Sequence, residues 1–181
     1  MRRATGCLNV MVVLAVLGCA GCYESPFPID SVPQANVEPA LIGVWRCLPF
    51  DEAATKPAAT LTIARGAERR YAVTLQGDGD PAESYEAYGS SIGGDVLFNL
   101  RTLKGGSNPW VFVRRTLVRS NLLHLQVLSS SALTLQDSPA ALRKAVGQLR
   151  EKPGAYEDLC ACVRTGAAHS ASPAVGTEAP R

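Results

Sequence analysis

After its first forty residues, the chain alternates between apolar and polar side chains in short runs, the pattern of β-strands with one buried face. In one run Val96, Phe98 and Leu100 share a face, while Asn99 and Arg101 lie on the opposite, polar face. Turn residues bound each run, as is typical of short strands. Eight strands are predicted in this way: 41–48, 58–65, 69–76, 83–89, 94–102, 110–119, 121–129 and 156–164.

The links between the first seven predicted strands are short and rich in turn residues. The segments 77–81 and 105–109, for example, combine Gly with Asp or Asn and end in Pro. A short link joins neighbouring strands that run in opposite directions. These strands are therefore expected to form an antiparallel meander.

One helix is predicted between the seventh and eighth strands. Asp137 or Ser138 can cap its start, and Pro139 stands in its first turn, where a missing N–H is harmless. Its apolar residues fall on one side, which must pack on the wall or the mouth of the domain: Leu142, Ala145, Val146 and Leu149. Residues 41–164 thus predict a mainly all-β domain, an up-and-down antiparallel barrel of about eight strands with one helix before the last strand.

Residues 1–18 have the features of an export signal. Arg2 and Arg3 form a positive start, and the ten residues from Leu8 to Leu17 are mostly apolar. Ten helical residues rise only about 15 Å, half the thickness of a bilayer's hydrocarbon core, so this segment is too short for a transmembrane anchor.

The signal ends in small residues next to cysteines, as Gly18-Cys19-Ala20-Gly21-Cys22. This ending resembles the lipobox of bacterial lipoproteins, in which small residues precede a lipid-modified Cys. Cys19 is the preferred attachment site because Val16 is aliphatic three positions upstream, and Cys22 is the alternative. The resemblance implies a protein anchored by lipid in the cell envelope, at the periplasmic face of the outer membrane rather than the inner one. An ordinary secretory signal, with the cysteines retained as thiols, remains the competing interpretation.

The two segments that flank the predicted barrel lack its alternation. Residues 19–40 contain the acylated Cys and then four prolines between 23 and 39, and proline holds a chain extended. We therefore expect a semi-rigid tether that holds the domain off the membrane. Residues 165–181 have almost no large apolar side chain, and they are expected to be a disordered tail.

The first strand begins with Gly43-Val44-Trp45. This Gly-x-Trp resembles the opening of the lipocalin-like, or calycin, barrels. The resemblance implies that Trp45 packs across the closed end of the barrel and that Arg164, from the last strand, lies over it. An arginine over an indole ring stabilises a fold, so this pair is assigned a structural role.

Three cysteines follow the signal region: Cys47, Cys160 and Cys162. Exported domains meet an oxidising compartment, where cysteines pair. If the last strand closes against the first, Cys47 lies near the other two. We expect a disulfide between Cys47 and Cys160, with Cys162 as the alternative partner. No metal site is expected, because the sequence has too few further ligands: its only histidines are His124 and His169.

Charge and motifs narrow the classes of function. The chain has 18 basic and 16 acidic residues, and Arg2 and Arg3 belong to the signal, so the exported part is electrically balanced. Such a balance gives no basic surface for nucleic acid. The sequence has no Gly-x-Ser-x-Gly, no His-Glu-x-x-His and no phosphate loop, so an enzyme is not expected and no cofactor is predicted.

Two functions agree with these features. The first is a membrane-anchored lipoprotein whose barrel binds a small apolar ligand, since eight strands enclose room for side chains or for one small molecule. The second is a structural or interaction lipoprotein with a solid barrel that contacts a protein of the envelope.

Overall fold

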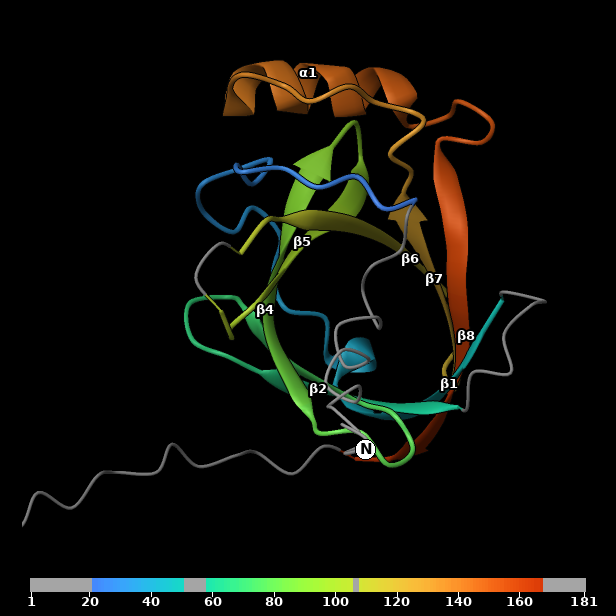
Figure 1. The fold of residues 1–181 in the computed structure, drawn as a ribbon. Helices are drawn as coiled ribbons and strands as arrows, with labels where there is room; N and C mark the ends of the chain where they lie inside the picture. Colours follow the sequence, from blue (N-terminus) through green and yellow to red (C-terminus); the bar gives the residue numbers. More distant parts are fainter. Residues whose placement is uncertain (1–20, 51–57, 106–107, 168–181) are drawn as a thin grey trace, which may run out of the picture.

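The computed structural model describes residues 21–50, 58–105 and 108–167 and shows a closed, eight-stranded antiparallel barrel (Figure 1). Neighbouring strands follow the order of the sequence, and the last strand pairs with the first. One helix precedes the last strand, so the predicted fold is confirmed. The strands are β1 (Gly43–Pro49), β2 (Ala59–Arg65), β3 (Tyr71–Gln76), β4 (Glu83–Ile92), β5 (Asp95–Thr102), β6 (Val111–Arg119), β7 (Leu122–Leu128) and β8 (Tyr156–Gly166).

The seam between β1 and β8 brings together residues that are far apart in the sequence. In its register Trp45 lies opposite Arg164, Cys47 opposite Cys162 and Pro49 opposite Cys160. Alternate residues of each strand face the barrel interior, and together they form one continuous apolar core. This interior core comprises Val37, Leu41, Trp45, Cys47, Leu61, Ile63, Tyr71, Ala87, Phe98, Val113, Leu123 and Cys162.

One end of the barrel is closed by the short helix η1 (Pro39–Leu41) (Figure 1). Trp45 is fully buried beneath it, and its indole Nε1 donates a hydrogen bond to the Leu41 carbonyl, at 3.0 Å. The Arg164 guanidinium carbon lies 4.3 Å from the centre of the Trp45 ring. Arg164 also donates to the Ile42 carbonyl, at 2.7 Å. The contact between Trp45 and Arg164 that the sequence predicts is present, and it lies where η1 meets the barrel.

Residues 21–38, which we name the N-terminal strap, are attached to the barrel. The strap begins at the end of the barrel opposite η1, where Tyr23 N–H donates to the Leu128 carbonyl at 2.8 Å. Ser25 and Trp110 exchange two backbone hydrogen bonds, at 2.8 and 2.9 Å. The strap then runs along the outside of the barrel to η1.

The middle of the strap is fixed equally firmly. Ile29 is 2% exposed, and its N–H donates to the Asn99 side chain at 2.8 Å. Gln34 N–H donates to the carbonyl of Gly89 at 2.9 Å, beyond the point where β4 stops pairing with β3. The expected free spacer over 23–39 is therefore corrected. Apolar residues between its prolines, among them Phe27 and Ile29, pack on the barrel wall instead of remaining in solvent, although Val32 is exposed.

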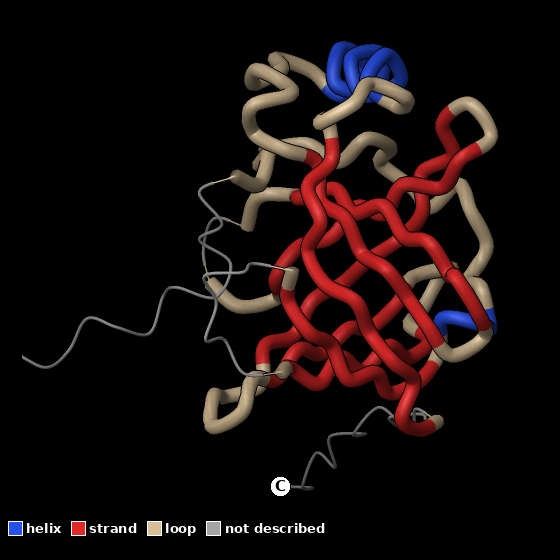
Figure 2. The backbone as a smooth tube through the Cα atoms, turned by 90° about the vertical axis from the view of Figure 1, so that its right-hand side faces the viewer, coloured by secondary structure: helices blue, strands red, loops and turns tan. Residues whose placement is uncertain are grey.

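The helix α1 (Pro139–Leu149) packs on the outer wall of the barrel, over β4, β5 and the strap (Figures 1 and 2). Ser138 caps it by accepting a hydrogen bond from Ala141 N–H, at 3.3 Å. Arg143 forms an ion pair of 2.6 Å with Asp30 of the strap. Strap, helix and wall share a second apolar core: Tyr23, Ile29, Tyr88, Ile92, Leu97, Trp110, Phe112, Leu128, Leu142, Val146, Leu149 and Ala155.

Several predicted segments fall wholly or partly outside the described residues. These are the signal 1–18, the preferred lipid site Cys19 and residues 168–181 of the expected tail. The first residues of that tail, Thr165 and Gly166, belong to β8, so the barrel extends slightly further than the sequence indicates.

Candidate functional site

The barrel interior is only partly closed to solvent. Next to η1 Trp45 is fully buried, whereas Ile42, Val96 and Leu117, which pack against the same core, are partly buried. Toward the opposite end, which we call the mouth, several inward-facing apolar side chains are only partly buried. They pack against the interior core and still reach solvent: Val73, Leu75, Leu100 and Leu125. Most of the accessible inward-facing side chains at the mouth are therefore apolar, as a site for a small apolar molecule requires.

A polar pair lies among these apolar residues. Glu83 and Tyr85, two positions apart on β4, face the same side as Ala87 of the interior core. The Tyr85 hydroxyl donates a hydrogen bond to the Glu83 carboxylate. Burial raises the pKa of Tyr85, and the neighbouring Glu83 raises it further, so Tyr85 remains a neutral donor at physiological pH. The two-residue spacing of Glu83 and Tyr85 in the predicted strand 83–89 already places both side chains on one face, but no site was predicted there.

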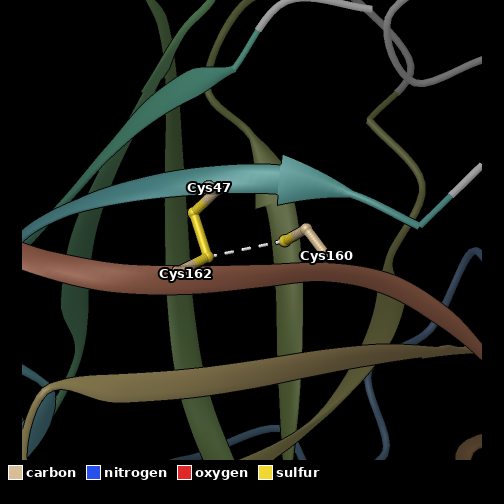
Figure 3. Close-up of side chains that lie close together, drawn as sticks. All are labelled: Cys47, Cys160 and Cys162. Atoms are coloured by element: carbon tan, nitrogen blue, oxygen red, sulfur yellow. Dashed lines mark hydrogen bonds between the residues drawn. A yellow bond between two sulfur atoms is a disulfide. The ribbon is translucent and has the colours of Figure 1, made fainter.

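Three sulfur atoms meet inside the barrel at the seam (Figure 3). Cys47 on β1 and Cys162 on β8 form a disulfide. The thiol of Cys160, two residues before Cys162 on the same strand, lies 3.6 Å from its sulfur. All three sulfurs lie within 4.8 Å of one another. We call these residues the cysteine cluster.

The disulfide corrects the preferred prediction, which paired Cys47 with Cys160. The register places Cys162 directly opposite Cys47, with α-carbons 3.9 Å apart, whereas Cys160 lies opposite Pro49. Alternation puts Cys160 and Cys162 on the same face, so the sequence alone left both as partners. Only the register of the seam distinguishes them.

The remaining thiol, that of Cys160, has low reactivity. Burial raises the pKa of Cys160 to about 12, because the apolar surroundings disfavour a thiolate. The thiolate is the reactive form of cysteine, so Cys160 is a poor nucleophile at neutral pH.

No family model matches the chain, and neither the curated proteins nor the solved structures compared with it give a match. Within residues 21–50, 58–105 and 108–167, no helix is both long and apolar enough to span a bilayer.

Proposed function

We propose that this protein is a bacterial envelope lipoprotein whose lipocalin-like barrel binds a small apolar ligand through its mouth, without catalysis. The observation that carries the proposal is the partial exposure of inward-facing apolar side chains toward the mouth. Leu75 and Leu100 pack against the interior core there and still reach solvent. A barrel filled solely for stability gains by burying these side chains completely, at about 25 cal/mol per Å² of apolar surface.

The polar pair adds a requirement on the ligand. The Glu83 carboxylate already accepts the Tyr85 hydroxyl proton, and it is partly exposed. It can accept a further hydrogen bond, because a carboxylate has several lone pairs. A ligand with an apolar body and one polar donor therefore fits the mouth better than a pure hydrocarbon.

The lipid attachment also belongs to the proposal, with Cys19 preferred and Cys22 as the alternative. The supporting observation is that the strap is fixed to the barrel from Tyr23 onward. Only two residues lie between Cys19 and Cys22, so the two sites are at most about 10 Å apart. A lipid at either site therefore holds the mouth end close to the bilayer surface, which gives an apolar ligand a short route from the membrane.

Ligand binding is tested on the chain from residue 20 onward, with the neutral apolar dye N-phenylnaphthylamine as probe. We expect one dye molecule per chain, with enhanced fluorescence. Leu75→Glu places a charge in the mouth and should weaken binding at least tenfold. Thr74→Glu, one residue away on the outer face, is the matched control and should bind as the unaltered chain does. Absence of dye binding, together with absence of a co-purified small molecule in native mass spectrometry, refutes the binding function.

Lipid attachment is tested separately in cells that are fed a clickable fatty acid. Cys19→Ala should abolish labelling and leave unprocessed precursor, whereas Cys22→Ala should leave labelling intact. The opposite pattern moves the attachment to Cys22. If the unaltered chain carries no lipid, the lipoprotein assignment is wrong, whatever the dye experiment shows.

A second candidate function is contact with an envelope protein. On the outer face of the seam Leu48 is 60% exposed, Phe50 47% and Val163 48%. Leu48 and Val163 lie on neighbouring strands and Phe50 follows the end of β1, and exposed apolar side chains on one face are of the kind that protein partners cover. Crosslinking in the native envelope from a photoreactive residue at position 48 should then capture a protein partner, and recovery of the monomer alone counts against this function.

A further inference from the structure

The cysteine cluster has no part in the proposed binding function, and its geometry is unusual. Cys47 comes from β1, while Cys160 and Cys162 come from β8, and the three sulfurs point toward one another inside the barrel (Figure 3). A disulfide needs only two of them. The third sulfur lies within 4.8 Å of both others, so the seam presents three convergent soft ligands.

These distances are close to those of a tetrahedral metal site. Zinc binds thiolate sulfur at about 2.3 Å, so two sulfurs of one tetrahedral site lie about 3.8 Å apart. The sulfurs of Cys160 and Cys162 are already 3.6 Å apart. Once the bond between Cys47 and Cys162 is broken, these two sulfurs must separate to this length, and each can move by rotation about its Cα–Cβ bond.

We propose that reduction of the Cys47–Cys162 disulfide converts the cysteine cluster into a three-thiolate site for a divalent cation of the zinc class. The reductant is either a dithiol, which becomes a cyclic disulfide and supplies two electrons and two protons, or a phosphine, which takes the oxygen of one water, becomes a phosphine oxide and leaves the two protons of that water for the thiols. The S–S bond breaks and two thiols form beside the thiol of Cys160. Binding of the cation then displaces one proton from each of the three thiols, and a water molecule completes the tetrahedron.

The charges favour a divalent ion over a monovalent one. Three thiolates with a divalent cation leave a net charge of −1 in the apolar interior, whereas a monovalent cation leaves −2, and uncompensated charge is costly there. The oxidised cluster has one thiol left and cannot form the site.

The test uses the full chain in mild detergent, with Cys7, Cys19 and Cys22 replaced by Ser so that only the cluster contributes thiols. The protein is reduced with a phosphine, desalted without oxygen and titrated with Zn²⁺ against a chromophoric chelator. Cd²⁺ in place of Zn²⁺ reports thiolate ligation through its sulfur-to-metal charge-transfer absorption. We expect one ion per reduced chain, with this absorption.

Cys160→Ser in the same background should weaken binding at least tenfold, although it leaves the disulfide possible. Ala161→Ser, on the outer face of the same strand, is the matched control and should bind as the background protein does. The oxidised background protein should bind no better than reduced Cys160→Ser. Circular dichroism of each reduced protein establishes that the barrel is retained. Equal affinity of Cys160→Ser and the reduced background protein, or of the oxidised and reduced forms, overturns the proposal.

Discussion

Replacement of Asn99 by Ala should loosen the N-terminal strap, because this buried amide joins the strap to the barrel wall. Asn99 is fully buried on the outer face of β5. Its Oδ1 accepts the Ile29 N–H at 2.8 Å. Its Nδ2 donates to the Ser90 hydroxyl at 2.9 Å and to the Tyr88 carbonyl at 3.3 Å. The substitution therefore removes all three of these bonds at once.

The magnitude follows from what each partner loses. Ile29 N–H is left buried without an acceptor, and an unsatisfied buried donor costs about 1–3 kcal/mol. The bonds to Ser90 and Tyr88 are worth about 1 kcal/mol together, because the Tyr88 contact is long and weak. We expect Asn99→Ala to lower the free energy of unfolding by about 3 kcal/mol, a large part of the stability of a typical domain.

Urea unfolding monitored by tryptophan fluorescence measures this loss, since Trp45 and Trp110 are both buried. Hydrogen exchange of the strap amides then distinguishes local release from global unfolding. Thr116→Ala is the control, because Thr116 lies exposed on the outer face of β6 and should change stability by less than about 0.5 kcal/mol. If Asn99→Ala behaves like the control, the strap is not held through this amide and the reasoning fails.

Three further predictions concern the seam and the closed end. Cys47→Ser removes a disulfide that spans 115 residues, and it should lower the free energy of unfolding in urea by up to about 4.8 kcal/mol, the limit set by loop entropy. A loss no greater than that of Cys160→Ser would show that the disulfide does not stabilise the barrel. Arg164→Ala removes the guanidinium from the face of Trp45 and should lower the free energy of unfolding by about 1–3 kcal/mol in the same assay. An unchanged urea midpoint would show that Arg164 does not stabilise the barrel. With a thiol pKa of about 12 in place of 9.0, Cys160 should react with iodoacetamide about 10³-fold more slowly at pH 8 than an ordinary thiol. Its rate should then rise about tenfold for each pH unit up to pH 12. Intact mass measures the reaction, and the reactivity of an ordinary thiol at pH 8 would show that Cys160 is not shielded.

Periodicity made most of the fold predictable. The eight predicted strands lie within three residues of the observed ones at each end, because inward-facing apolar residues alternate with outward-facing polar ones along most of them. The helix was equally clear, since Ser138 and Pro139 mark its start and its apolar residues recur at helical spacing. These signals are local, and a single sequence contains them in full.

The outer face of β5 shows where this reasoning stops. Alternation marked Asn99 as a solvent-facing polar residue, yet it is fully buried under the strap. A polar residue on the outer face of a strand has the same pattern whether it meets water or a covering segment. The strap itself lacked periodicity because it contributes single anchors, such as Tyr23 and Ile29, at irregular spacing. The burial of Asn99 and the position of the strap both depend on contacts between residues far apart in the sequence, which periodicity does not reveal.

The contacts that stabilise this barrel are concentrated at the η1 end, at the seam and on the wall covered by the strap. Trp45, Arg164 and η1 close one end, and the Cys47–Cys162 disulfide locks the adjoining seam. The strap and α1 stiffen the wall at β4 and β5 from outside. Inward-facing Leu75 and Leu100, by contrast, keep part of their surface in solvent. Regions with fewer buried contacts open at lower free energy, so the mouth is the end at which the proposed ligand would enter.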